Sequence, residues 1–444
     1  MKNTRTRSKA LQLLLVFGLV LSLTACDLLP KTIDIPWLNP QTHETVVPLP
    51  GVKQTPTVPD LQTQPPEDTT PPEPPKSLKL WVSPELAPGP ETAAGRLLQD
   101  RLLVFEEQSG VAVHIRVKSQ TGAGGLLDSL EAASAVAPQA LPDLIVLSHQ
   151  DLAAAAEKKL LYPHAEMADL MKTEDWYPFA SELADQGAEI LGIPFMGDAL
   201  VALYDPQSEV VPAADWSEVV SGQGVLGFAA DDPLAVFPLL LYLSLDGEVE
   251  DPQHHILLEK KPLTEMLTIL RTANQERKIS DLSLGFQSHA QAWKAFLSRS
   301  LDAVVVPANR LIGPSPDPGL EQIKPSLMAP RMTLINAWAF ALSSPDPAAQ
   351  RIAASLADFL TESQFLAQWT QALGMLPSRP SALSLWEDNT YQASLDVIAS
   401  TALLNPRAEV YNRVGPVLRN AVILILKDNA SPEETAKEAL ESMQ

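Results

Sequence analysis

Residues 78–147 alternate between short apolar strands and amphipathic helices, and this alternation constrains the fold more than any other feature of the sequence. The pattern predicts strands at 78–82, 112–117 and 142–147, separated by helices at 93–109 and 126–137. The order strand, helix, strand, helix, strand is typical of a parallel sheet that is covered by helices. The sequence therefore predicts an α/β fold.

The rest of the chain repeats this rhythm less regularly. Strands are predicted at 224–228 and 301–306, and helices at 150–159, 263–277, 289–299, 347–360 and 431–442. The last helix has a clear beginning, because Ser431 can cap it, Pro432 suits its first position and two glutamates follow in the first turn. Residues 78–444 form a block of a length that normally divides into two lobes or domains.

The N-terminal residues have the three parts of a secretory signal. Four basic residues precede an apolar run at 11–21, and small residues follow it up to Cys26. The run is too short for a permanent membrane span. Residues 1–25 are therefore predicted to be a signal peptide that directs export.

Cys26 is the only cysteine of the chain, so no internal disulfide can form. The stretch Leu23-Thr24-Ala25-Cys26 resembles the lipobox of bacterial lipoproteins, in which the cysteine becomes the lipidated N-terminus. This resemblance implies a protein held by lipid at the extracytoplasmic face of the cell membrane. The alternative is an ordinary secreted protein with one stray cysteine. In a bacterium with two membranes, Asp27 would resemble a signal for retention in the inner membrane.

Residues 26–77 are predicted to be a tether between the lipid and the folded part. Thirteen prolines lie in this segment, interspersed with Thr, Gln and Glu. Proline lacks the backbone donor and the freedom that helices and central strands need, so such a segment stays extended and solvated. At polyproline spacing, about fifty residues span roughly 150 Å.

The strongly acidic charge narrows the range of partners. The formal charge is −22, and removal of residues 1–25, which carry four basic and no acidic residues, leaves −26. Nucleic acids and anionic lipid surfaces would repel such a protein. We expect a monomer without a nucleic-acid partner, attached to the membrane only through the lipid on Cys26.

Five further segments, in a fixed order along the chain, point to one family. They are 78–82 with 110–111, 141–146 with 160–163, 190–194 with 199–205, 291–298 with 301–307, and 335–342 with 359–364 and 374–379. Together they resemble family 1, the sugar-type bacterial extracellular solute-binding proteins, which include the maltose-binding proteins. The most specific of the five contains Trp338 and ends on Pro377 and Arg379.

The resemblance implies a type II periplasmic-binding-protein-like fold, with two α/β lobes, a hinge and a ligand cleft between the lobes. It implies lobe I at 78–196 and 326–376, lobe II at 197–325 and 377–444, and hinge segments near 195–200, 322–328 and 374–378. It also implies a small solute, a carbohydrate or related polyol, that is captured in the cleft and delivered to the permease subunits of an ABC transporter.

Candidate ligand-binding residues follow from the rule that open α/β sheets bind ligands at the carboxyl ends of their strands. Trp338 is added because the family places an aromatic residue against its ligand there, and Trp176 because a tryptophan in a loop can stack on a sugar ring. Asp198 lies in the predicted crossing between the lobes. The full set is Ser83, Glu85, Ser148, His149, Trp176, Asp198, Asn309 and Trp338.

The sequence departs from the sugar-binding pattern at two places. Ala308-Asn309-Arg310 stands where sugar binders of the family often carry an aromatic residue, and the segment near Tyr411 lacks the tryptophan of maltose-type members. These departures argue against a maltodextrin-like ligand. Asp198 and Arg310 could instead recognise a charged solute.

No pattern for enzyme catalysis, a metal or a cofactor is present in the sequence. It contains neither a G-x-S-x-G nor an H-E-x-x-H motif, and lipidation would consume its single cysteine. His254 and His255 are interpreted as part of a solvated acidic loop and not as a metal site. The alternative to an import receptor is a lipoprotein that keeps the two-lobed fold as a sensor or scaffold with a degenerate pocket.

Overall fold

The computed structural model describes residues 76–173, 175–185, 189–207, 224–312, 322–327, 332–386 and 391–443. All of them belong to one compact unit formed by residues 70–444. The predicted signal peptide, Cys26 and the predicted tether up to residue 75 lie outside the described residues.

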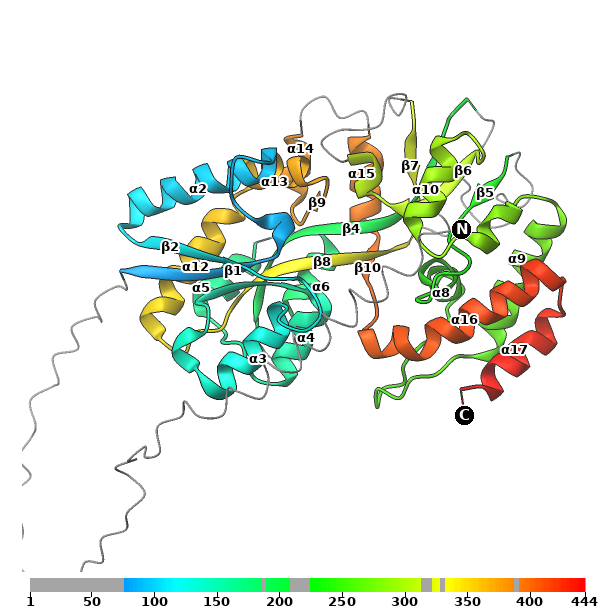
Figure 1. The fold of residues 1–444 in the computed structure, drawn as a ribbon, viewed down its shortest axis with the longest axis horizontal. Coiled ribbons are helices and arrows are strands. Elements are labelled where there is room, and N and C mark those ends of the chain that lie inside the picture. The colour runs from blue at the N-terminus through cyan, green and yellow to red at the C-terminus, as the bar shows by residue number, and fades with distance from the viewer. Residues whose placement is uncertain are drawn as a thin grey trace, which may run out of the picture. The chain divides into compact units, whose positions relative to one another are not determined.

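Strands and helices alternate along the described chain (Figure 1). The strands are β1 (Ser77–Val82), β2 (Ala112–Val117), β3 (Leu144–Ser148), β4 (Gly192–Tyr204), β5 (Leu226–Gly227), β6 (Ala303–Pro307), β7 (Lys324–Ser326), β8 (Thr333–Leu342), β9 (Leu376–Pro377) and β10 (Ala402–Leu404). The α-helices are α2 (Ala93–Ser109), α3 (Leu126–Val136), α4 (His149–Glu157), α5 (Ala165–Met171), α6 (Pro178–Ala184), α8 (Val236–Leu243), α9 (Lys260–Gln275), α10 (His289–Leu297), α11 (Asn309–Ile312), α12 (Pro347–Leu360), α13 (Ser363–Leu373), α14 (Pro380–Ser384), α15 (Gln392–Ser400), α16 (Ala408–Asp428) and α17 (Pro432–Glu441). Short 3-10 turns occur at η1 (Pro84–Leu86), η2 (Pro138–Ala140) and η3 (Asp281–Gly285).

The sheet is parallel at its N-terminal side and mixed in the middle. Its order is β2-β1-β3-β8-β4-β6-β5 among the described strands. The pairs β1–β2 and β1–β3 are parallel, which confirms the prediction from the strand-helix rhythm, since α2 and α3 supply the crossovers that parallel neighbours need. The pairs β3–β8, β8–β4 and β4–β6 are antiparallel, so the sheet as a whole is not the purely parallel one that the rhythm predicts.

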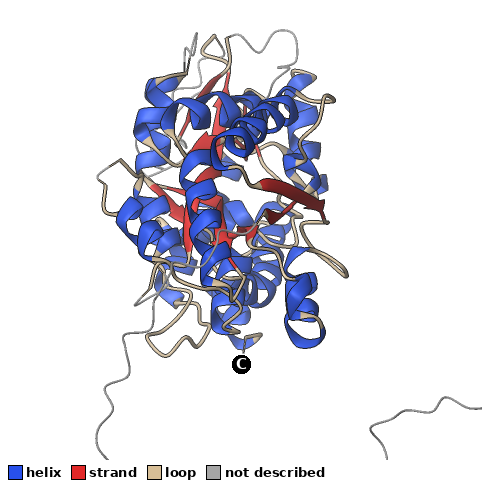
Figure 2. Ribbon diagram, turned by 90° about the vertical axis from the view of Figure 1, so that its left-hand side faces the viewer, coloured by secondary structure: helices blue, strands red, loops and turns tan. Residues whose placement is uncertain are grey.

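Helices lie on both sides of the strands (Figure 2). Among them, α12 contacts β1, β3 and β8, whereas α8, α9, α16 and α17 pack against one another. The long strand β4 serves two separate hydrophobic cores because successive side chains of a strand point to opposite faces. Ala199, Val201 and Leu203 belong to the first core, and Leu200 and Ala202 to the second.

Local capping sets several helix ends as the sequence predicts. The Ser431 side chain accepts a hydrogen bond from the Glu434 amide at the start of α17, and Gly110 ends α2 in the left-handed region with φ of 72°. Trp81 and Trp369 belong to the first core and are 2% and 1% exposed. The predicted lobe boundaries stay a prediction.

Candidate functional site

Side chains of three neighbouring strands share one face in the middle of the sheet. Asp198 of β4 lies directly opposite Asn336 of β8, and Met196 lies opposite Trp338. Trp338 is also the cross-strand neighbour of Ser148 at the end of β3. Directly opposed residues of paired strands point to the same face, so these five side chains form one surface. Three of them, Ser148, Asp198 and Trp338, are in the predicted set.

The side chain of Asp198 lies in an environment that disfavours its ionised form. Burial raises the pKa of Asp198 to about 7, although two backbone N–H groups and the charge of Arg310 act in the opposite direction. One of these N–H groups is that of Asn309, which donates to Asp198 Oδ1 at 3.1 Å. The structure thus brings Asn309 to Asp198 through its backbone. A carboxyl group with this pKa exchanges its proton close to neutral pH.

His149 joins this surface to a distant segment of the chain. Its Nε2 lies 2.8 Å from the carbonyl oxygen of Asn405, and its Nδ1 lies 3.2 Å from the side-chain oxygen Oδ1 of Asn336. The side chain of Asn405 in turn accepts a hydrogen bond of 3.0 Å from the Tyr411 hydroxyl. Burial lowers the pKa of His149, and hydrogen bonds to Asn405 and Asn336 oppose the shift only in part.

Ser148 serves mainly as the cap of α4. Its hydroxyl accepts a hydrogen bond from the Asp151 amide at 3.2 Å and donates to the Asp151 carboxylate at 2.8 Å. The serine before the helix is why the chain turns at the carboxyl end of β3 and carries His149 toward β8. This agrees with the predicted helix start after the third strand.

A second group of ionisable side chains interacts electrostatically through Arg310, which acts on both Asp198 and His289. Asp232 accepts backbone hydrogen bonds from Leu234 (3.1 Å) and Val236 (3.4 Å) at the start of α8. Burial raises the pKa of Tyr411, and the charge of Asp232 adds to this shift. Burial also lowers the pKa of His289, while Asp232 raises it and Arg310 lowers it further. Asp232 thus acts electrostatically on both Tyr411 and His289, and Arg310 acts on His289.

Three predicted residues do not join this surface through any hydrogen bond in the described part of the chain. Ser83 is buried before η1, and Glu85 is exposed on it. Trp176 is only 8% exposed, donates from Nε1 to the Leu170 carbonyl at 3.3 Å and has the guanidinium of Arg379 over its ring at 4.0 Å. The loop tryptophan is therefore packed in the first core. Its role in binding stays a prediction.

The structure adds residues that sequence reasoning missed. They are Asn336, Asn405, Asp232 and His289, with Tyr411 noted from the sequence only because the segment near it lacks a tryptophan. Asn336 could have been singled out from the sequence, because it is a polar carboxamide residue inside an otherwise apolar strand. The others lie in loops or at helix starts, where a polar residue is ordinary, so nothing in the sequence sets them apart.

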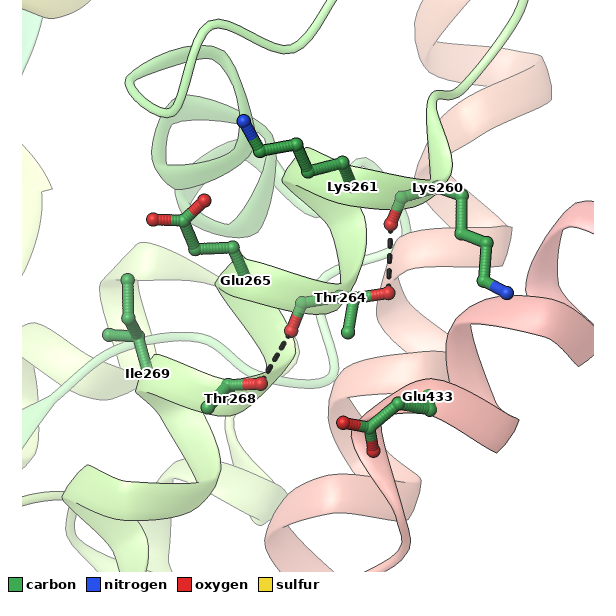
Figure 3. Close-up of a pocket in the computed structure, with 7 residues that line it drawn as sticks. All are labelled: Lys260, Lys261, Thr264, Glu265, Thr268, Ile269 and Glu433. Atoms are coloured by element: carbon green, nitrogen blue, oxygen red, sulfur yellow. Dashed lines mark hydrogen bonds between the residues drawn. The ribbon is translucent and has the colours of Figure 1, made fainter.

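Two pockets of the described structure lie apart from this surface. One of ≈ 540 Å³ lies beside α9 and α17 (Figure 3), lined by Lys260, Lys261, Thr264, Glu265, Thr268, Ile269 and Glu433. The hydroxyls of Thr264 and Thr268 are engaged with carbonyl groups of their own helix. Another of ≈ 280 Å³ lies between α2 and α13 and includes Arg101 and Phe365. Neither shares a residue with the surface around Asp198.

The described residues hold no group of three or more His, Cys, Asp or Glu side chains that could bind a metal ion. His255 pairs with Asp251 at 2.9 Å, and His254 lies 3.8 Å from Glu250 in an exposed loop. In the same part of the chain, none of the helices is both long enough and apolar enough to cross a membrane.

Comparisons with known proteins point to one family. Residues 104–395 match the family model described as bacterial extracellular solute-binding protein. No curated protein sequence gives a significant match. Solved structures with a similar fold include the sugar-binding protein MalE of Xanthomonas citri, with a TM-score of 0.67 and 14% identity over 83% of this chain and 96% of that one.

Two further similar structures are described with maltose. The extracellular solute-binding protein of Staphylococcus aureus in complex with maltose has a TM-score of 0.66 and 16% identity over 84% of this chain and 97% of that one. Maltose-bound MalE3 of T. maritima has a TM-score of 0.60 and 16% identity over 83% and 98%. These likenesses confirm the predicted periplasmic-binding-protein-like α/β fold. The chain belongs to the bacterial extracellular solute-binding proteins, and it is a binding protein rather than an enzyme.

Proposed function

We propose that this protein captures a carbohydrate or related polyol outside the cytoplasm and delivers it to the permease subunits of an ABC transporter. The signal at residues 1–25 and the lipid on Cys26 would hold it at the extracytoplasmic face of the cell membrane. The solute would bind between lobe I (78–196 and 326–376) and lobe II (197–325 and 377–444).

The observation that carries this proposal is the convergence of Asp198, Asn336, His149 and Trp338 on one face of the paired strands β4 and β8. Carboxylate and carboxamide groups exchange hydrogen bonds with hydroxyls, and an indole ring can cover the apolar face of a sugar. The maltose bound in two structurally similar proteins supports a carbohydrate over an amino acid or a peptide.

Because β4 pairs with β8 across the predicted boundary at residue 196, closure of the lobes would bend these strands about the surface that holds Asp198. A solute that contacts both lobes would favour the closed state by its differential affinity for that state. No covalent step is needed for capture or release.

The direct test is thermal unfolding of the purified protein with maltose, maltotriose, polyols, sugar acids, amino acids and oligopeptides. A ligand at one hundred times its dissociation constant stabilises the native state by about 2.7 kcal/mol, which raises the melting temperature of a protein of this size by a few degrees. We expect this shift with a sugar or polyol. A shift with amino acids or peptides alone would exclude a carbohydrate receptor, and no shift throughout would favour the sensor or scaffold alternative.

Substitution of Trp338 tests the stacking role. Trp338 is 9% exposed, so Trp338→Ala is expected to cost about 3–5 kcal/mol of stability as well as affinity. Trp338→Phe keeps an aromatic ring with less stacking area. We expect Phe to weaken sugar binding by less than tenfold and Ala by more than tenfold, measured by calorimetry on the folded variants. Equal affinity in all three proteins would remove Trp338 from the site.

A further inference from the structure

The connection between β10 and α16, residues 405–407, is held by side chains of α4. The carbonyl oxygen of Asn405 lies 2.8 Å from Nε2 of His149, and that of Pro406 accepts a hydrogen bond of 2.9 Å from the side chain of Gln150. The partners of each contact are 256 residues apart in the chain. Since α4 itself packs against β3 and β8, these contacts tie the connection to the N-terminal side of the sheet.

Arg407 completes this arrangement with an ion pair on each side. Its guanidinium lies 3.7 Å from the carboxylate of Glu157 on α4. It also donates to one carboxylate oxygen of Glu250, from Nε at 3.1 Å and from Nη2. Glu157 follows Gln150 by about two helical turns, so both side chains leave the same side of α4. Each residue of the 405–407 connection therefore contacts α4.

The other partner of Arg407 belongs to a loop that is anchored on the second core. The carbonyl oxygen of Val249 accepts a hydrogen bond of 3.0 Å from the Leu257 amide, which closes this loop around Glu250. Val249 and Ile256 pack against the second core, to which α16 also belongs. Arg407 thus stands between α4 on one side and elements of the second core on the other.

By the predicted boundaries, the contacts of α4 with this connection join the two lobes. α4 lies in predicted lobe I, whereas the 405–407 connection, Glu250 and α16 lie in predicted lobe II. His149 also contacts Asn336, which shares its face of the sheet with Asp198. The contacts therefore lie beside the proposed solute surface, and the lobes cannot separate there without breaking them.

We propose that α4 and the 405–407 connection form an interlobe latch, in which Gln150 and Glu157 hold the Pro406 carbonyl group and the Arg407 guanidinium when the lobes are closed. This inference rests on the proposed function for the division into lobes. The latch stabilises the closed state without touching the solute. Because affinity falls in proportion to the population of the binding-competent state, Gln150 and Glu157 set the affinity from outside the solute surface.

A double variant, Gln150→Met with Glu157→Lys, removes the latch. Methionine has nearly the length of glutamine but no donor for the Pro406 carbonyl group, and lysine repels Arg407. Glu157 is exposed, so its replacement leaves the core intact. We expect the ratio of closed to open protein to fall about tenfold, from the loss of one hydrogen bond and one ion pair.

Glu131→Lys is the matched control. Glu131 pairs with Lys158 at the end of α4, and both residues lie in predicted lobe I. This variant breaks an ion pair close to the latch and changes the net charge by the same amount as the double variant. It leaves every contact between α4 and the 405–407 connection in place.

Small-angle scattering of the purified full chain without ligand tests the latch directly. The N-terminal segment is common to all the proteins, so a difference between them reports on the folded part. We expect a larger radius of gyration for the double variant than for wild type, and no change for Glu131→Lys. Equal radii in all three proteins, or the same increase in the control, would overturn the proposal.

The affinity for maltose provides a second measurement. We expect the double variant to bind maltose about tenfold more weakly than Glu131→Lys, and the difference to shrink in 1 M NaCl, which screens the ion pair of Glu157. Equal affinities would overturn the proposal. If none of the three proteins binds maltose while the radii differ as expected, the ligand of the proposed function is wrong and the latch stands.

Discussion

Asp198→Asn is expected to raise the free energy of unfolding at pH 8 by up to about 4 kcal/mol, while it weakens solute binding. Burial raises the pKa of Asp198 from 3.8 to about 7, and a pKa that differs by one between the folded and unfolded chain corresponds to about 1.4 kcal/mol. Ionising this carboxyl group is therefore unfavourable in the folded state. Asparagine has no charge to desolvate, yet its side-chain oxygen can still accept the hydrogen bond that the Asn309 amide donates at 3.1 Å.

The sign of the pH dependence follows from linkage. Above pH 4 the Asp198 carboxyl group of the unfolded chain loses its proton while that of the folded chain retains it. Wild-type protein is therefore progressively destabilised relative to Asp198→Asn from about pH 4 to pH 7, and the difference is complete above pH 7. Urea unfolding of both proteins at pH 4 and pH 8 measures it.

A matched control removes the effect of net charge. Asp281 is exposed at the start of η3, and Asp281→Asn changes the charge by the same amount without relieving burial. We expect that control to change the unfolding free energy by less than about 0.5 kcal/mol. If Asp198→Asn is no more stable than wild type at pH 8, the carboxylate is better solvated than its surroundings indicate. A gain in stability together with a loss of affinity is typical of a residue kept for function.

Gly415→Ala is expected to destabilise the protein by about 2–3 kcal/mol, although alanine is normally better than glycine inside a helix by about 1 kcal/mol. Gly415 lies within α16, and a methyl group there would meet the carbonyl oxygens of Pro233 at 2.7 Å and Leu234 at 3.0 Å. Both are backbone atoms, so the loop before α8 has to move as a whole. That loop contains Asp232, so we also expect weaker solute binding.

Gly285→Ala provides the control for Gly415→Ala. Gly285 ends η3, and an added methyl group there meets no atom within 4 Å. We expect its effect on the melting temperature to be within about 1 °C, against a fall of several degrees for Gly415→Ala. Equal melting temperatures for the two variants would show that α16 and the 233–234 loop can separate without cost.

Much of the secondary structure could be predicted from the sequence because its signals are local. The predicted helices at 93–109 and 347–360 coincide with α2 and α12, and the strand at 112–117 with β2. The predicted strand at 224–228 shrinks to the two residues of β5, since pairing with a neighbour and not propensity decides how far a strand extends. The antiparallel insertion of β8 between β3 and β4 has no local signal at all.

The candidate site was predictable only in part. The rule of strand ends proposed Ser148 and His149, and the family resemblance proposed Trp338, and the structure places all three near Asn336. Trp176, which packs against Arg379, and Trp338 both belong to the first core and are 8% and 9% exposed, so burial alone does not distinguish them. A tryptophan in a loop has the same sequence signal whether its ring faces solvent or the core, because burial is decided by the segments that pack over it.

By itself, the sequence determined the α/β class and the proline-rich segment, because periodicity, capping and composition act between residues that are neighbours in the chain. Its resemblance to known members indicated the family, and it predicted an export signal. Only the tertiary structure decided that His149 meets Asn336 and Asn405, which lie 187 and 256 residues further along the chain. It also decided that Asp198 faces Asn336 across two paired strands. The physical reason is that pKa values, tautomers and hydrogen-bond partners depend on which distant groups share a buried site, and chain order does not specify this.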